Sequence, residues 1–191
     1  NVLATIGNLN NHLGVPFTLL RLNESHDIAI IEMGANKFGD IQELSEIAEP
    51  TRGIITNIGK AHLEGFINFE GVLKTKKELY DSIENSNGIL VVNNDDQVLK
   101  NNIPANIKTY SYGTTDSSTI SGELIGLSPF VEMKWSHNTY ISEPIETQMI
   151  GKYNFYNYLA AATFGFIFNV PNEDISKAIL YRFWRDVVGK I

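Results

Sequence analysis

The stretch Ile28–Asn36, which reads IAIIEMGAN, decides the fold class of this chain. Its first four residues are apolar on both faces, as in a strand that is buried within a parallel sheet. Glu32 follows them directly, at the end where open α/β sheets bind their ligands. The carboxylate is therefore placed to meet a metal ion or a polar substrate, although a glutamate that only begins a solvated loop gives the same pattern.

A second short apolar run, Gly53–Gly59, predicts another strand, and His62 and Glu64 follow it. If the two strands are neighbours in one parallel sheet, Glu32 and His62 come to the same sheet edge. Carboxylate oxygen and imidazole nitrogen suit several divalent metals. A single histidine is more often structural, so the metal interpretation depends on its pairing with Glu32.

Helical and strand patterns alternate along most of the chain. We expect a helix over Asp40–Ala48 with Asp40 as its cap, and strands over Gly88–Asn93 and Lys108–Tyr112. This alternation predicts an α/β fold with a mainly parallel sheet flanked by helices. From Thr119 to Met149 apolar and polar residues alternate instead, which predicts an antiparallel section near 119–149.

The helix that follows the second strand carries one lysine on its apolar face. Counting about 100° per residue from Val72, Ile83 falls at about 20° and belongs to the same apolar stripe. Lys76 falls at about 40°, inside the stripe, whereas Lys74 and Lys77 fall outside it. A lysine on an inward face must reach solvent along the apolar surface, pair with an acid or react.

Two groups of asparagines are further candidates. Asn8, Asn10 and Asn11 lie in a glycine-containing run that composition alone explains as a turn. Asn154 and Asn157 are three residues apart at the start of a long apolar helix, so they share its first turn. A helix start with two amides can hold a polar ring or a phosphate, and N-capping is the competing explanation.

Composition narrows the class of protein. The 191 residues predict one domain, or one domain with a small appendage, and the net charge of -7 disfavours a general nucleic-acid surface. The absence of cysteine excludes disulfides, cysteine–zinc sites and thiol catalysis, and it is typical of a cytoplasmic protein. No apolar window is long enough to predict a transmembrane helix.

Four motifs, in order along the chain, resemble the Mur ligases of peptidoglycan synthesis. They are Thr5–Asn11 with Gly14–Pro16, then Ile31–Asn36, Asn57–Gly65 and Tyr153–Ala161. The resemblance reaches to about Ile179 and implies the central ATP-binding domain of these enzymes, a Rossmann-like three-layer fold. The first two motifs favour the branch that joins D-Ala-D-Ala to UDP-MurNAc-tripeptide.

The resemblance implies an ATP-dependent amide ligase. ATP phosphorylates the carboxylate of the UDP-MurNAc-tripeptide, the amine of D-Ala-D-Ala attacks the acyl phosphate, and phosphate leaves. Mg²⁺ neutralises the charge on the phosphate oxygens in such reactions. The cofactors are then ATP and Mg²⁺, and the partners are the two peptide substrates.

The same resemblance assigns roles to residues of this chain. It makes Glu32, His62 and Lys76 the catalytic residues and metal ligands, with Lys76 at the position of a lysine that the family carbamylates. It places Asn8, Asn10 and Asn11 in the segment that faces the UDP-sugar and the metal. It also matches Asn154 and Asn157 to the asparagines on the adenine side.

The sequence departs from the family pattern in two places, at the missing phosphate loop and in the tail 182–191. The family's central domain begins with a phosphate-binding loop, Gly-x-x-Gly-Lys-Thr/Ser, and this sequence contains no such motif. We therefore expect residues 1–181 to be a central domain that lacks its phosphate loop, and 182–191 to be a divergent or non-native tail. Such a fragment is expected to be inactive by itself. The alternatives are another Mur ligase, a folylpolyglutamate synthetase-like ligase, or a non-catalytic binding domain of the same fold.

Overall fold

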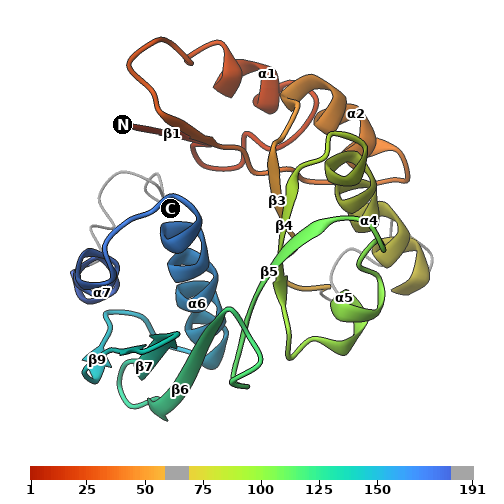
Figure 1. Cartoon of the computed structure of the whole chain (residues 1–191). Helices are drawn as coiled ribbons and strands as arrows, with labels where there is room; N and C mark the ends of the chain where they lie inside the picture. Colours follow the sequence, from red (N-terminus) through yellow and green to blue (C-terminus); the bar gives the residue numbers. More distant parts are fainter. Residues whose placement is uncertain (59–68, 182–191) are drawn as a thin grey trace. The chain divides into compact units, whose positions relative to one another are not determined.

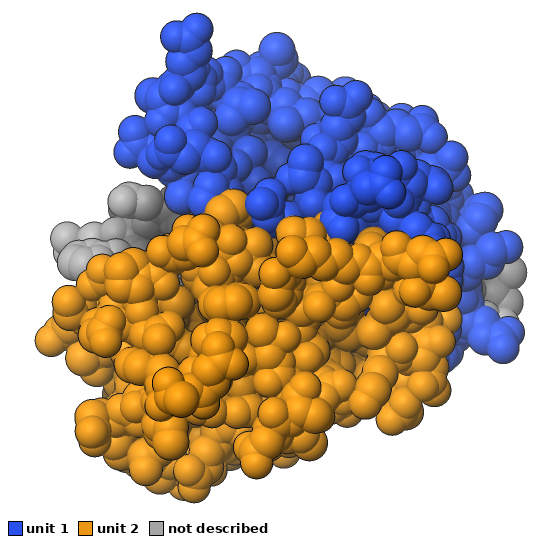
Figure 2. Space-filling model, viewed as in Figure 1, with its two compact units in different colours: residues 1–53, 58–88, 183–191 blue, residues 54–57, 89–182 orange. Residues whose placement is uncertain are grey.

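The structure, a computed structural model, describes residues 1–58 and 69–181, which divide into two compact units (Figure 2). Within these ranges, unit 1 comprises residues 1–53, 58 and 69–88, and unit 2 comprises residues 54–57 and 89–181. No helix in the described ranges is long and apolar enough to cross a membrane. His62 and the predicted tail 182–191 lie outside the described residues.

Unit 1 combines a short parallel strand pair with three helices (Figure 1). Its elements are β1 (Val2–Ala4), α1 (Gly14–Leu19), β2 (Ile28–Ile30), α2 (Asp40–Ala48) and α4 (Phe69–Asn85). Helix α2 contacts both α1 and α4. Apolar side chains from all three helices and from β1 fill the interior: Leu3, Val15, Ile41, Leu44, Val72, Tyr80 and Ile83.

The prediction that the strand at Ile28 neighbours the strand at Gly53 in one sheet is wrong. Strand β2 pairs with β1 in a two-stranded sheet, whereas β3 (Arg52–Ile54) belongs to a seven-stranded sheet. The residues that take the partner position are Val2–Ala4, which precede the Asn-rich run and are extended. Within the described residues this sheet has two strands, and Ile30 is 60% exposed, so β2 is not a buried strand.

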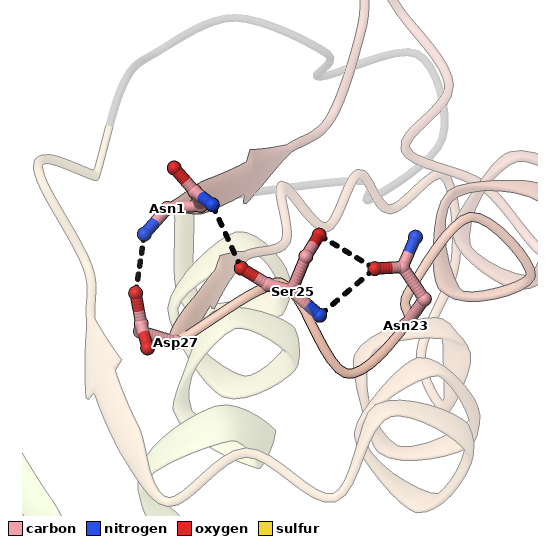
Figure 3. A network of polar contacts seen from close by, with 4 residues as sticks. All are labelled: Asn1, Asn23, Ser25 and Asp27. Atoms are coloured by element: carbon pink, nitrogen blue, oxygen red, sulfur yellow. Dashed lines mark hydrogen bonds and ion pairs between the residues drawn. The ribbon is translucent and has the colours of Figure 1, made fainter.

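A polar network closes the turn before β2 and fixes its register with β1 (Figure 3). The Asn1 amide donates to the Ser25 carbonyl at 3.0 Å, and the α-amino group of Asn1 pairs with Asp27. The side-chain oxygen of Asn23 accepts from both the amide and the hydroxyl of Ser25. The two strands are therefore paired from their first residues, with Val2 opposite Ile28.

Unit 2 is built on a mixed sheet, as predicted. Its strands run in the order β4-β5-β6-β7-β8, with β9 also on β7 and the end of β3, Ile54, at the opposite edge. Strands β4, β5 and β6 are parallel, and β7 to β9 add the antiparallel section. The strands are β4 (Ile89–Asn93), β5 (Lys108–Gly113), β6 (Ile120–Gly126), β7 (Glu132–His137), β8 (Tyr140–Ile141) and β9 (Ile145–Glu146), and the helices are α5 (Gln97–Asn101), α6 (Lys152–Ile167) and α7 (Asn172–Leu180).

Helix α6 forms the centre of unit 2 and lies against β4, β5 and β6 (Figure 1). Phe155, Leu159 and Ala162 are buried in one cluster with Val91 and Trp135 from the sheet. The Trp135 indole N–H also donates to the Ser176 hydroxyl at 3.0 Å, which ties β7 to α7. Removing these side chains from water is the main source of stability for this unit.

One local prediction needs correction. Gly39, not Asp40, is the N-cap of α2, and Asp40 instead accepts hydrogen bonds from the preceding turn. The cap of α5 is Asp96, whose carboxylate accepts from the amides of Val98 and Leu99. His137 is half-buried against the Phe166 ring, at 4.1 Å between ring centres.

Helix α1 buries small side chains and leaves large apolar ones exposed. Phe17, Leu20 and Leu22 are exposed, whereas Val15 and Thr18 are buried. The Thr18 hydroxyl donates to the carbonyl of Gly14 at 3.0 Å, so a polar side chain is satisfied locally on the inward face. The apolar count of this short segment therefore did not indicate its orientation.

Candidate functional site

The Asn-rich loop after β1 holds Glu32 in place from two sides. The Glu32 amide donates to the hydroxyl of buried Thr5 at 2.9 Å, and the Asn10 side-chain amide donates to the Glu32 carboxylate at 2.7 Å. Thr5 itself continues the strand pairing, because its amide donates to the Ile30 carbonyl at 3.0 Å. An exposed carboxylate is thus fixed in orientation at the end of a parallel strand pair.

The contact between Asn10 and Glu32 depends on a glycine. The Gly34 amide donates to the Asn10 carbonyl at 2.7 Å, which brings the two loops together. A Cβ atom on Gly34 would lie 2.9 Å from the side-chain Cγ and Oδ1 of Asn10, closer than such atoms normally approach. Glycine at position 34 therefore allows the Asn10 side chain to reach the carboxylate.

The three candidate asparagines of this loop have different surroundings. Asn10 contacts Glu32, as described above. The side-chain oxygen of Asn11 accepts from the amides of Leu13 and Gly14, so it orders the entry to α1. Asn8 is exposed, and its carbonyl accepts the Asn10 amide at 2.8 Å. In this loop Asn10 orients the Glu32 carboxylate, and Asn8 and Asn11 are close to Asn10 in sequence.

Lys76 differs in environment from the two lysines next to it. Its side chain is half-buried on α4, and burial lowers the pKa of its amine. Lys74 is exposed, with its Nζ 4.4 Å from the centre of the Phe38 ring. Lys77 pairs with Asp81 one turn further along the helix. These surroundings agree with the helical angles, which placed only Lys76 among these lysines on the apolar stripe.

Glu32 is the described residue best suited to a divalent cation. Carboxylate oxygen is the ligand that Mg²⁺ prefers, and the hydrogen bond from Asn10 orients this one before any ion arrives. Within residues 1–58 and 69–181, no three histidine or acidic side chains gather around one point. A cation at Glu32 would therefore need ligands in addition to the described histidine and acidic side chains.

The asparagines of α6 form a second polar site, in unit 2. The buried Asn154 amide donates to the Ile150 carbonyl at 2.8 Å, and its oxygen accepts from Asn157 at 3.1 Å. Neither side chain is the cap of the helix, because the N-cap residue is Gly151, which has no side chain to form one. Asn154 thus anchors the exposed Asn157 at the first turn of α6.

Sequence reasoning missed a link between this turn and the sheet. The Asp95 carboxylate, just past β4, accepts from the Thr114 amide at 2.8 Å and from the Tyr156 hydroxyl at 3.3 Å. Burial, and then the charge of Asp95, raise the pKa of the Tyr156 phenol. The ends of two parallel strands and the start of α6 therefore meet at one carboxylate. The acids at the end of β4 were the only sequence signal for this.

Comparison with known proteins identifies the family. The model of the Mur ligase middle domain matches residues 1–165. The chain belongs to the Mur ligase middle-domain family. The resemblance seen in the four sequence motifs and the predicted α/β fold are thereby confirmed, whereas the roles of the individual site residues remain predictions.

Several similar proteins are named UDP-N-acetylmuramoyl-tripeptide–D-alanyl-D-alanine ligase or MurF. The UDP-N-acetylmuramoyl-tripeptide–D-alanyl-D-alanine ligase of Bacillus subtilis is 33% identical over 180 residues, which are 92% of this chain and 37% of that protein. The crystal structure of MurF from Acinetobacter baumannii superimposes with a TM-score of 0.83 at 31% identity, over 93% of this chain and 39% of that one. MurF ligase from Thermotoga maritima, solved in complex with ADP, has a TM-score of 0.78 at 24% identity and shows the same fold over 92% of this chain and 41% of that one.

These matches cover most of this chain but only part of each relative. Nearly all of this chain aligns, but it spans less than half the length of the B. subtilis and A. baumannii relatives. Membership of the middle-domain family follows from the match, whereas the activity of a whole ligase involves sequence that this chain does not contain.

Proposed function

We propose that this chain supplies the middle domain of an ATP-dependent ligase that joins D-Ala-D-Ala to UDP-MurNAc-tripeptide. The observation that carries the proposal is the 33% identity over 92% of the chain to a curated ligase of that name. The Asn10–Glu32 arrangement adds support, because it orients a carboxylate where the family resemblance implies a metal ligand. We place the reaction in the cytoplasm, where the nucleotide-linked substrate and ATP would both be available.

In this proposal unit 1 holds the metal. Glu32, His62 and Lys76 are its ligands, and Asn10 keeps the Glu32 carboxylate in the binding orientation. Mg²⁺ bound there would neutralise the charge that develops on the phosphate oxygens during phosphoryl transfer. Asn8 and Asn11 flank Asn10 in the loop and are proposed to face the UDP-sugar.

Lys76 becomes a ligand only after modification. Its neutral amine attacks carbon dioxide, an N–C bond forms, and one proton is released, which leaves an anionic carbamate. Partial burial on α4 lowers the pKa of the amine and so favours the neutral form that reacts. The change replaces a cation that would repel Mg²⁺ with a group that binds it.

Unit 2 is proposed to bind the adenine side of ATP. Asn154 is buried and hydrogen-bonded on both sides, so it presents Asn157 in a fixed position at the helix start. The amide of Asn157 can donate to or accept from the edge of a purine ring. The Asp95–Tyr156 contact supports the same turn of α6 from the sheet.

The proposed reaction transfers two groups in sequence. The γ-phosphoryl group of ATP passes to the carboxylate of UDP-MurNAc-tripeptide, giving an acyl phosphate and ADP. The amine of D-Ala-D-Ala then attacks the acyl carbon, the new amide bond forms, and phosphate leaves. The test is phosphate release by the full-length protein, which should require both peptide substrates.

Replacing D-Ala-D-Ala with a single D-glutamate distinguishes this proposal from the other ligases of the family. Turnover with D-glutamate and not with D-Ala-D-Ala would reject the proposed substrate. No turnover with any amine would favour a non-catalytic binding domain.

The 191-residue chain by itself should bind Mg-ATP weakly or not at all. Its sequence contains no Gly-x-x-Gly-Lys-Thr/Ser loop, whose backbone amides cradle the phosphates in nucleotide-binding proteins. Isothermal titration calorimetry measures this directly. Low-micromolar affinity, about -8 kcal/mol, would contradict the expectation, and the full-length protein provides the matched comparison.

A further inference from the structure

Helix α2 begins without a capping side chain of its own. Its N-cap is Gly39, which has a φ of 93°, a conformation that favours glycine, and it has no side chain to offer. The first amides of a helix have no partners within the helix, so a buried helix start needs acceptors from elsewhere. In unit 1 these acceptors come from α4.

Glu78 of α4 supplies both acceptors. Its Oε1 accepts from the Gly39 amide at 2.8 Å and its Oε2 from the Gln42 amide at 2.9 Å. In a capping box the N-cap and N3 side chains of the same helix satisfy these two amides. Here one carboxylate from another helix does so, and at 8% exposure it is nearly buried. The positive end of the helix dipole stabilises its charge.

The position of Glu78 on α4 gives this contact a consequence for Lys76. The two residues are two positions apart, or about 200° around the helix, so they lie on nearly opposite sides of it. Fixing Glu78 against the start of α2 therefore fixes the rotation of α4 about its own axis. That rotation determines the side of the helix on which Lys76 lies.

The start of α2, which Glu78 contacts, is joined to Glu32 by a short segment of chain. Asp40, the first residue of α2, accepts from the amides of Asn36 and Lys37 at 2.9 and 3.1 Å. The segment that runs from Glu32 into α2 is thus held at Asn36 and Lys37 by Asp40, and at Gly39 by Glu78. The carboxylate of Glu78 therefore links helix α4 to the segment that follows Glu32, in addition to the packing of α2 against α4.

We propose that Glu78 is a positioning residue, which holds α4 against the segment after Glu32 and so sets where Lys76 lies relative to the Glu32 carboxylate. This inference rests on the proposed function, because it assigns Glu78 a role in a site that Glu32 and Lys76 share. It differs from a purely structural role in one respect. Loss of the contact should change the modification of Lys76 and the need for Mg²⁺, and not stability alone.

The test compares Glu78→Gln with Glu84→Gln in the full-length protein. Glutamine keeps the size of Glu78 but replaces one acceptor oxygen with a donor amide, which cannot pair with a backbone N–H. Glu84 is half-exposed on the same helix and provides the matched control. Glu78→Ala is the harsher variant, and Glu78→Gln carries the test if the alanine protein does not fold.

Two readouts separate positioning from stability. The first is the ¹³C NMR carbamate signal of the protein in ¹³C-bicarbonate without nucleotide, and the second is the Mg²⁺ concentration for half-maximal ligase activity. We expect Glu78→Gln to weaken the carbamate signal and to raise the Mg²⁺ requirement about tenfold, the range seen for groups that orient metal ligands. The KM for D-Ala-D-Ala should be unchanged, and additional bicarbonate should restore part of the activity.

The outcomes distinguish the two levels of the proposal. A Glu78→Gln protein with a lower melting temperature but wild-type carbamate signal and Mg²⁺ requirement would overturn the positioning role and leave the proposed function intact. A wild-type protein with neither ligase activity nor carbamate would overturn the proposed function, and this inference with it.

Discussion

The two polar sites of this chain are supported in different ways. In unit 2, Asn154 and Asp95 lie at the ends of elements that enclose a continuous apolar core, in which Phe155, Leu159 and Trp135 are almost fully buried. In unit 1, Glu32 follows a strand pair of which Ile30 is 60% exposed. The Glu32 backbone amide donates to the Thr5 hydroxyl, and its carboxylate accepts from the Asn10 side chain.

The difference shows which substitutions should matter in each unit. Where packing supports the polar groups, many van der Waals contacts each contribute a little to holding them in place. Their geometry is therefore lost only when the core is disturbed. Where one hydrogen bond to the carboxylate and one to the backbone hold a residue, as at Glu32, the displacement of one partner is enough to disturb it. Substitutions in the two units should therefore affect stability and function to different degrees.

The largest effect on stability should come from Phe155→Ala in unit 2. Phe155 is 1% exposed, and emptying such a site costs about 3–5 kcal/mol of unfolding free energy. The matched control is Tyr153→Ala on the same helix turn, where the side chain is 67% exposed and the cost should stay within about 0.5 kcal/mol. Urea unfolding measures both. Equal shifts in the two midpoints would show that α6 is not packed as described.

Gly34→Ala should have an intermediate effect, in unit 1. The new methyl group would meet the Asn10 side chain at 2.9 Å, so Asn10 must move away from Glu32. We expect a loss of about 1 kcal/mol, because the flexible Asn10 side chain can turn aside but then gives up its hydrogen bond to Glu32. Gly126→Ala is the control, because the nearest atom to its Cβ would be at an ordinary 3.4 Å.

A double mutant tests the reason for the Gly34 effect. If Gly34→Ala acts by displacing Asn10, then Asn10→Ala removes the clash, and the two losses should fall short of additivity by at least about 0.5 kcal/mol. Additive losses would mean that the methyl group clashes with something other than Asn10. The measurement is the free energy of unfolding of the two single variants and the double variant.

The smallest effect should come from Asp95→Asn and should appear at high pH. Burial and Asp95 raise the pKa of Tyr156, so the folded protein keeps the phenol proton to higher pH than the unfolded chain does. Stability therefore falls as the pH rises above the ordinary tyrosine pKa of about 10. Removing the charge of Asp95 should make that fall shallower.

Unfolding free energies from pH 9 to 11 test this prediction. Tyr156→Phe, which has no proton to lose at this position, should give the shallowest dependence. An Asp95→Asn protein with a steeper decline than wild type would show that Asp95 does not raise the pKa of Tyr156.

Local sequence patterns predicted most elements but not their partners. The apolar stripe of α4 and the alternation of β6 to β9 were visible because each depends on the period of a single element. The pairing of β2 with β1 was missed, because the apolar run at Ile28 indicates a strand and gives no information on which strand it joins. In the structure the pairing is extended by the hydrogen bonds that Thr5 and Asn1 make with the segment around β2.

The site was predictable to a similar extent. Glu32 and Asn10 were each identified from their own motif, and the structure brings them together at 2.7 Å. Glu78 was missed because its helical angle lies opposite the apolar stripe, where a charged residue is normally solvated. It is buried only because the start of α2 covers it, and such a contact between distant segments leaves no periodic signal in the sequence.

We propose that unit 1 carries the metal site through Glu32, His62 and a carbamylated Lys76. The most direct measurement is the ligase activity of full-length Lys76→Ala and Lys77→Ala proteins, with and without added bicarbonate. We predict that Lys76→Ala loses at least about a hundredfold in kcat, in the range of a lost electrostatic group, and that a small added carboxylate restores part of it. Lys77→Ala, which loses only a surface ion pair, should keep wild-type turnover. Wild-type turnover by Lys76→Ala, or a greater loss in Lys77→Ala, would contradict the assignment.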